Sequence, residues 1–200
     1  SSVGATGNAL MAAVNAEGIT NIINAAQEPE IESLCNFLNK MGAEIKGVGT
    51  SELTICGKQN LHAGVEYTII PDRIEAGTFL IAAAITGGNI TIFNVEPDHM
   101  NIVLKYIQDA GFELNIKENS IQIKKIQNSS IIPINISTDI YPGFPTDLQA
   151  QWMALMTKAA GHSSIIEQIY SDRFTHISEL SRFGAHIHLA GNNADIRGSD

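Results

Sequence analysis

Apolar and polar residues alternate with two different periods along the chain, and their order predicts a unit of helix, strand, helix, strand and strand. Asn8–Glu17, rich in Ala and Met, predicts a helix, and the β-branched run Ile19–Ile23 predicts a strand. Glu28–Glu30 opens a second helix, because proline and acidic side chains favour the first helical turn. Ala43–Val48 and Leu53–Cys56 alternate and predict a hairpin that completes the unit.

This unit occurs three times, and the third copy is the weakest. Each copy contains a block bounded by two glycines, which lie 24, 23 and 23 positions apart: Gly18 and Gly42, Gly88 and Gly111, Gly161 and Gly184. The predicted second copy runs from Ile74 to about Lys124, with its hairpin turn at Lys117–Asn119. The predicted third copy runs from Asp147 to about Gly198, with its hairpin turn at Gly191–Asn193. Three copies of one supersecondary unit are the economical explanation.

Two segments between the copies are further strand candidates, namely Tyr67–Ile70 and Ile131–Ser137. The predicted fold class is α/β (α+β), with helices packed inside small mixed sheets.

Composition narrows the function classes. A net charge of −9 argues against non-specific nucleic-acid binding, which needs a basic surface. The longest apolar run, Phe79–Ile85, is too short to span a bilayer, and we expect no secretory leader and a cytoplasmic location. Cys35 and Cys56 lack the spacing of a metal site and are expected to be buried free thiols. His186 and His188 alternate on one strand face and should be exposed to solvent, with no metal site implied.

The stretch Phe144–Gln151 carries the strongest candidate for chemistry. Gly143 and Pro145 prevent a helix from entering it, and the pattern from Leu148 to about Lys158 predicts a helix that leaves it. The carboxylate of Asp147 is therefore expected near unpaired backbone N–H groups at a helix start. An aspartate there is ordinarily a helix cap.

Five ordered motifs resemble the enolpyruvyl transferase family and, within it, the UDP-N-acetylglucosamine 1-carboxyvinyltransferases. The motifs, which together span nearly the whole chain, are Ser2-Val3-Gly4-Ala5-Thr6, Glu28-Pro29-Glu30-Ile31, Pro71-Asp72-Arg73-Ile74-Glu75-Ala76-Gly77-Thr78, Phe144-Pro145-Thr146-Asp147-Leu148-Gln149-Ala150-Gln151 and Glu179-Leu180-Ser181-Arg182-Phe183-Gly184-Ala185-His186. The resemblance implies repeated βαβαββ-type units of the inside-out prism fold. Six units would form two domains of the complete enzyme.

On this resemblance, residues 1–69 are the last unit of one domain, and residues 70–200 are two units of the other. The family's catalytic cysteine loop and Lys-Asn pair would precede Ser1, and its Asp-Leu-Arg segment and phosphate-binding arginine would follow Asp200. Cys35 and Cys56 match no reactive-cysteine motif. We therefore expect a piece of a longer repeat array that is inactive alone, with the remainder of the same enzyme as its partner.

The implied reaction joins the 3-hydroxyl of UDP-N-acetylglucosamine to C2 of phosphoenolpyruvate and expels phosphate, in peptidoglycan precursor synthesis. No cofactor, metal, nucleic acid or membrane is implied. Asp147 matches the family's general base. Ser2-Val3-Gly4 matches a segment that meets the nucleotide. Ile169 matches a position that packs on the nucleotide, with ordinary burial in a strand as the alternative. Arg173 matches an arginine near the cleft, although a surface arginine is an equal alternative, and His176 is a modest candidate.

Two other functions remain open from the sequence. One is the sister transferase that acts on shikimate 3-phosphate, which shares the fold. The other is a non-catalytic, repeat-built binding module. Titration with the UDP-sugar and with shikimate 3-phosphate separates the three possibilities.

Overall fold

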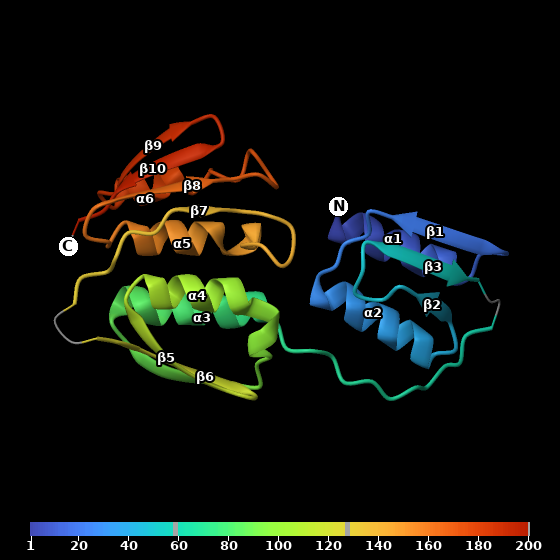
Figure 1. Ribbon diagram of the computed structural model, residues 1–200. Coiled ribbons are helices and arrows are strands. Elements are labelled where there is room, and N and C mark those ends of the chain that lie inside the picture. Colours follow the sequence, from blue (N-terminus) through green and yellow to red (C-terminus); the bar gives the residue numbers. More distant parts are fainter. Residues whose placement is uncertain (58–59, 127–128, 200) are drawn as a thin grey trace. The chain divides into compact units, whose positions relative to one another are not determined.

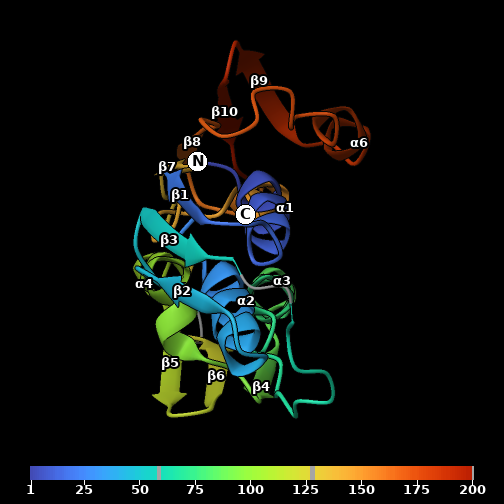
Figure 2. The ribbon, with the colours of Figure 1, turned by 90° about the vertical axis from the view of Figure 1, so that its right-hand side faces the viewer.

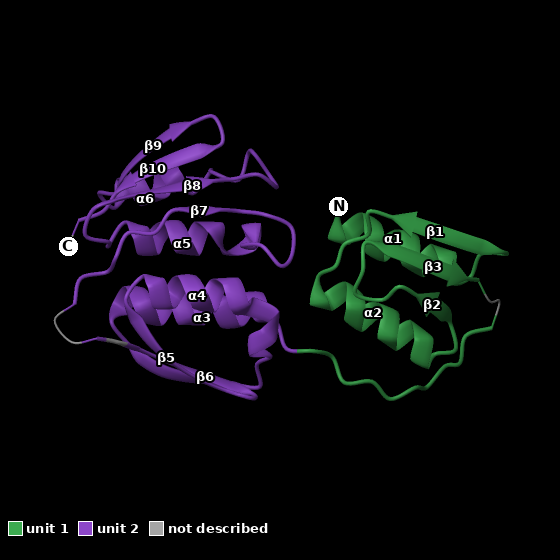
Figure 3. Ribbon diagram, viewed as in Figure 1, with its two compact units in different colours: residues 1–70 green, residues 71–200 purple. Residues whose placement is uncertain are grey.

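The computed structural model describes residues 1–57, 60–126 and 129–199, which form two compact units. Unit 1 is Ser1–Ile70 and unit 2 is Pro71–Asp200 (Figure 3). Each unit is described by itself below. Both contain helices and small sheets, which confirms the predicted fold class.

Unit 1 is a single copy of the predicted repeat. Its elements in chain order are α1 (Val3–Ala13), β1 (Ile19–Ile23), α2 (Pro29–Lys40), β2 (Glu44–Lys46) and β3 (Glu52–Cys56). The strands form an antiparallel sheet in the order β1-β3-β2. The apolar stripe of α2, which includes Ile31, Cys35 and Leu38, is buried in one core with Leu53 and Ile55 of the sheet.

The first half of unit 2 repeats this order. Its elements are α3 (Arg73–Thr86), β4 (Asn89–Phe93), the 3₁₀ turn η1 (Pro97–Met100), α4 (Asn101–Asp109), β5 (Phe112–Lys117) and β6 (Ser120–Lys125). Asp72 caps α3 by accepting from the backbone N–H groups of Ile74 and Glu75, and Gly87 ends the helix in the left-handed conformation. The sheet order is β4-β6-β5, the same as in unit 1.

The second half of unit 2 contains the third copy. Its elements are β7 (Ile136–Ser137), the 3₁₀ turn η2 (Thr146–Leu148), α5 (Gln149–Met156), β8 (His162–Ile166), α6 (Ile177–Arg182), β9 (His186–Ala190) and β10 (Asn193–Arg197). The sheet order is β7-β8-β10-β9, so β8, β10 and β9 repeat the order of the other copies. β7 joins parallel to β8, which makes this sheet mixed. The predicted threefold repeat is confirmed in element order and sheet topology.

Helices lie inside unit 2. Figure 1 shows α3, α4 and α5 between the sheet β4-β6-β5 and the sheet β7-β8-β10-β9. One hydrophobic core joins all of them. The ring of Tyr106 packs against this core beside the buried rings of Phe144 and Trp152. Their ring centroids lie 5.6 to 6.1 Å apart, a distance at which aromatic pairs attract. In Figure 2, α6 projects to one side of β9 and β10, and none of its six residues is buried.

Several predicted elements differ from the structure. The first helix is Val3–Ala13 instead of Asn8–Glu17, because Ser2 caps it earlier than its apolar pattern suggested. Tyr67–Ile70 forms no strand; the Tyr67 hydroxyl instead contacts Ser33 of α2. Only Ile136–Ser137 of the predicted strand Ile131–Ser137 pairs as a named strand. Pro133, which cannot donate to a ladder, lies before it.

Candidate functional site

Asp147 lies on a rigid element of unit 2. The neighbouring side chains Phe144, Leu148 and Trp152 are buried in the core, and they fix the turn η2 and the start of α5. The helix α5 spans Gln149–Met156, shorter at both ends than the predicted Leu148–Lys158. Among the described residues, no side chain caps η2 or α5. The expected capping role of Asp147 is therefore absent, and its side chain is 54% exposed.

Asp147 instead forms an ion pair with Arg173. The two residues are 26 positions apart, and Nη1 of Arg173 lies 2.5 Å from Oδ1 of Asp147. Nη1 also lies 3.4 Å from the hydroxyl oxygen of Thr146, and the Arg173 carbonyl accepts from Gln149. Both charged side chains are more than one-third exposed, so this pair contributes at most about 1 kcal/mol to stability. Other contacts must therefore hold the two side chains in this arrangement.

The carboxylate of Glu167 supplies that order. Glu167 follows β8, is 1% exposed, and accepts hydrogen bonds on both oxygens. Oε1 accepts from the Thr138 hydroxyl at 2.7 Å and from the backbone N–H groups of Ile169 and Tyr170 at 2.9 and 3.0 Å. Oε2 accepts from the Thr146 hydroxyl at 2.9 Å. One buried carboxylate thus joins the end of β7, the turn before α5 and the loop after β8.

Sequence reasoning did not find Glu167. It is an acid at the end of an apolar strand, and its burial depends on donors from three separate segments. One signal was available: Glu167 lies six residues after Gly161, and the same offset from Gly18 and Gly88 gives asparagines in the other copies. A charged residue in one copy, at a position that is neutral in the other two, indicates that this position has a different role in that copy.

The remaining predicted binding residues fall in two places. Ile169 lies in the loop after β8 and is 44% exposed, and its backbone N–H donates to Glu167. Ser2, Val3 and Gly4 lie in unit 1, where the Ser2 hydroxyl accepts from the N–H of Ala5 and begins α1. The structure therefore brings Asp147 and Arg173 together within unit 2, with Ile169 close in sequence to the carboxylate that orders them.

His176 and the two cysteines have different surroundings. His176 is half-buried at the start of α6, and burial lowers the pKa of its imidazole. Cys35 is buried and burial raises the pKa of its thiol to about 11, with the charge of Glu32 adding to the effect, so it is a poor nucleophile. Cys56 is also a free thiol but only partly buried, so the predicted burial is wrong for this residue.

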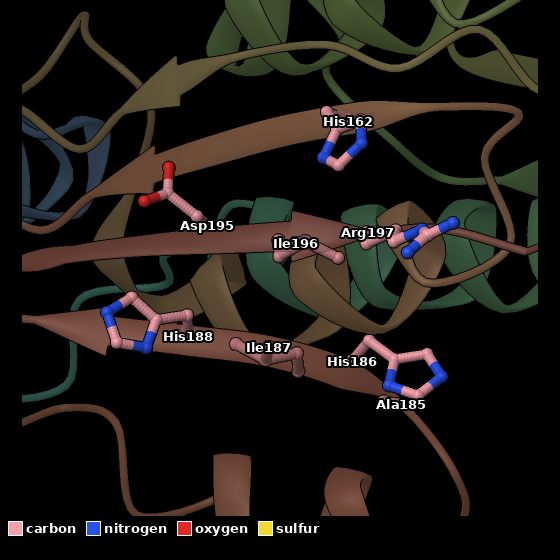
Figure 4. A pocket seen from close by; sticks show the side chains of 8 residues that line it. All are labelled: His162, Ala185, His186, Ile187, His188, Asp195, Ile196 and Arg197. Atoms are coloured by element: carbon pink, nitrogen blue, oxygen red, sulfur yellow. The ribbon is translucent and has the colours of Figure 1, made fainter.

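A second polar surface lies on the exposed face of the third copy's sheet, opposite the face whose residues are buried. Figure 4 shows His162, His186, His188, Asp195 and Arg197 around an open depression of about 430 Å³. Both His186 and His188 are exposed, as predicted. Within residues 1–57, 60–126 and 129–199, no cluster of His, Cys, Asp or Glu has the arrangement of a metal site. Asp147, Ile169 and Arg173 do not line this depression.

The arrangement around Asp147 suits proton transfer at a surface that solvent or a ligand can reach. An exposed carboxylate can accept a proton, and a guanidinium 2.5 Å away can hold its direction or bind an anion.

Over the parts of the chain that the structure describes, no helix is both long and apolar enough to cross a membrane.

Comparison with known proteins identifies the family. The chain belongs to the EPSP synthase (3-phosphoshikimate 1-carboxyvinyltransferase) family, whose model matches residues 1–200. Within curated proteins it is similar to UDP-N-acetylglucosamine 1-carboxyvinyltransferase of Pelodictyon phaeoclathratiforme, with 56% identity over 99% of this chain and 46% of that protein. The protein of the same name from Chlorobium chlorochromatii is 54% identical over the same shares. The chain thus spans about half the length of these relatives.

A solved structure supports the fold. The enolpyruvyl transferase NikO from Streptomyces tendae matches with a TM-score of 0.87 over 98% of this chain and 46% of that one. Its sequence identity of 21% is low, so this likeness concerns the fold alone.

Proposed function

We propose that this chain is part of an enzyme that transfers the enolpyruvyl group of phosphoenolpyruvate to the 3-hydroxyl of UDP-N-acetylglucosamine. The observation that carries the proposal is 52–56% identity, across nearly the whole chain, to curated proteins named UDP-N-acetylglucosamine 1-carboxyvinyltransferase. The activity then belongs to peptidoglycan precursor synthesis in the cytoplasm, and so to cell-wall formation, cell shape and cell division.

Asp147 acts as the general base in this proposal. As the sugar oxygen bonds to C2 of phosphoenolpyruvate, the hydroxyl proton passes to the Asp147 carboxylate and the electron pair of the C2=C3 bond takes up a proton at C3. C3 then loses a proton and the double bond re-forms, as the bond from C2 to the phosphate oxygen breaks and phosphate leaves. A positioned base is worth about 10²–10⁴ in rate. Exposure of the side chain and its attachment to a rigid turn support this role.

The other predicted residues bind substrate. Ser2, Val3 and Gly4 lie at the start of an 11-residue helix, where backbone N–H groups suit a diphosphate. Ile169 offers an exposed apolar side chain that can pack against the nucleotide. Arg173 neutralises charge beside the base. Residues 1–69 and 70–200 then belong to two different domains of the complete enzyme, one unit in the first and two in the second.

Phosphate release by the complete enzyme tests the proposal. With phosphoenolpyruvate present, UDP-N-acetylglucosamine should sustain turnover and shikimate 3-phosphate should not. The 200-residue chain alone should show no turnover, because one carboxylate cannot position and neutralise phosphoenolpyruvate unaided. Turnover by the chain alone would contradict the expectation that the chain is an incomplete enzyme.

The sister reaction is the second candidate, since the matching family model carries the description 3-phosphoshikimate 1-carboxyvinyltransferase. Turnover with shikimate 3-phosphate and not with the UDP-sugar would establish it. Binding of neither compound by the complete protein would favour a non-catalytic module.

A further inference from the structure

The three copies differ at one equivalent position. Six residues after the first glycine of each block stand Asn24, Asn94 and Glu167. Asn24 and Asn94 are exposed and adopt left-handed φ angles of 59° and 54°. Asparagine tolerates this conformation well, and it turns the chain after the first strand. In the third copy, a buried carboxylate replaces this exposed turn residue.

The hydrogen bonds of Glu167 divide between two tasks. Those on Oε1, from Thr138 and from the backbone of Ile169 and Tyr170, close the loop after β8. This loop continues into a turn in which the Arg173 N–H donates to the Tyr170 carbonyl. The bond on Oε2 comes from Thr146, the residue immediately before Asp147. The same carboxylate therefore holds the segments of both partners in the Asp147–Arg173 ion pair.

The ion pair does not hold itself together. Both side chains are more than one-third exposed, and an exposed pair contributes little net attraction in water. Buried hydrogen bonds to a charged acceptor are about twice as strong as neutral ones and fix direction. The arrangement of Asp147 and Arg173 thus follows from the buried network.

We propose that Glu167 is a positioning residue, which orients Asp147 through Thr146 and Arg173 through the loop after β8. The proposal rests on the proposed function, in which Asp147 is the base. Glu167 itself is buried and accepts no proton from substrate. Its contribution is the geometry of the pair, and a small misplacement of a reacting group lowers the rate steeply.

Two threonines provide a matched test, because each donates a hydroxyl to a different oxygen of Glu167. In the complete enzyme, Thr146→Val should lower kcat about tenfold or more with little change in KM for the UDP-sugar. Thr146→Ser keeps the hydroxyl and should keep kcat within about twofold. Thr138→Val removes one of the three bonds on Oε1 and leaves those from the backbone N–H groups of Ile169 and Tyr170, so it should lower kcat less than Thr146→Val while lowering Tm more.

A readout independent of turnover follows the ion pair directly. Side-chain NMR signals of ¹⁵N-arginine in the 200-residue chain should show a restrained Arg173 guanidinium in the parent, Thr146→Ser and Thr138→Val. Thr146→Val should lose that signal. If Thr138→Val does not fold, Ser137→Ala replaces it as the control, since Ser137 contacts Gln168 of the same loop without touching Glu167.

The outcomes separate this inference from the proposed function. A restrained Arg173 and normal kcat in Thr146→Val would overturn the positioning role. Equal loss of kcat in Thr146→Val and the control would also overturn it, because the effect would then follow stability. If Asp147→Asn turns over normally in the same series, the base assignment fails, and the Arg173 signal still decides whether Glu167 positions the pair.

Discussion

The second and third copies share a topology but use their polar side chains differently. In the second copy, polar groups finish local structure: Asp72 caps α3, and Asn94 turns the chain after β4. In the third copy, Asp147 caps no described helix and pairs with Arg173, while Glu167 gathers donors from three segments. The repeat therefore supplies the scaffold, and the departures from it supply a candidate site.

The second helices differ as well. The stripe Val103, Leu104 and Ile107 of α4 is buried in the core. None of the residues of α6 is buried, and Phe183 just after it is 91% exposed. The second helix of the third copy, which follows Arg173 in the chain, is thus more exposed to solvent than that of the second copy.

Exchanging the residues that differ between the copies should give the largest change in stability. Glu167→Asn makes the third copy resemble the second, but the shorter side chain cannot reach Thr138 and Thr146 together. Buried donors left unpaired cost about 1–3 kcal/mol each, so unit 2 should lose about 3 kcal/mol or more. The reciprocal change Asn94→Glu is at an exposed position, where glutamate adopts the left-handed φ of 54° less readily than asparagine, and should cost about 1–2 kcal/mol. Equal losses of unfolding free energy for the two variants, measured by denaturant unfolding, would show that the two positions contribute equally to stability.

A glycine pair tests how tightly the second copy packs on the third. Gly77 of α3 faces Leu148, and an added Cβ would lie 2.6 Å from Leu148 Cδ1. Gly77→Ala should therefore destabilise unit 2 by about 1–3 kcal/mol. Gly7 holds the equivalent place in the first copy, where a Cβ would meet Ile31 and Leu34 at an ordinary 3.8 Å. Gly7→Ala should be neutral or stabilise by about 0.5–1 kcal/mol. The opposite ranking in thermal unfolding would contradict the packing described.

The smallest effect concerns pH and His176. Burial lowers its folded-state pKa below the usual 6.5. As pH falls below about 6.5, the unfolded chain therefore gains a proton before the folded chain does, and stability decreases until the folded pKa is reached. His176→Gln should remove this component of the pH dependence, and His186→Gln, at an exposed position, should not. Denaturant midpoints between pH 7 and pH 5 provide the measurement; identical slopes in the parent and His176→Gln would disprove the assignment.

The sequence predicted the fold better than the site. Strands such as β1 and β4 and helices such as α2 were predicted because their periods and their bounding glycine and proline are local. Tyr67–Ile70 was wrong because a β-branched run forms a strand only where a partner strand is available. The Asp147–Arg173 pair joins residues 26 positions apart, and the burial of Glu167 depends on three segments meeting. Such contacts are tertiary and leave no local periodicity in the chain.

Turnover and stability of Asp147→Asn, measured on the same preparation of the complete enzyme, test the central claim most directly. Asparagine keeps the size of aspartate but cannot take the sugar hydroxyl's proton, so the rate should fall about 100-fold or more. Tm should change little, because the lost ion pair is exposed. The matched control is Asp109→Asn, which breaks the exposed Lys105–Asp109 pair of the second copy and should leave the rate unchanged. Near-normal turnover of Asp147→Asn would show that Asp147 is not the general base.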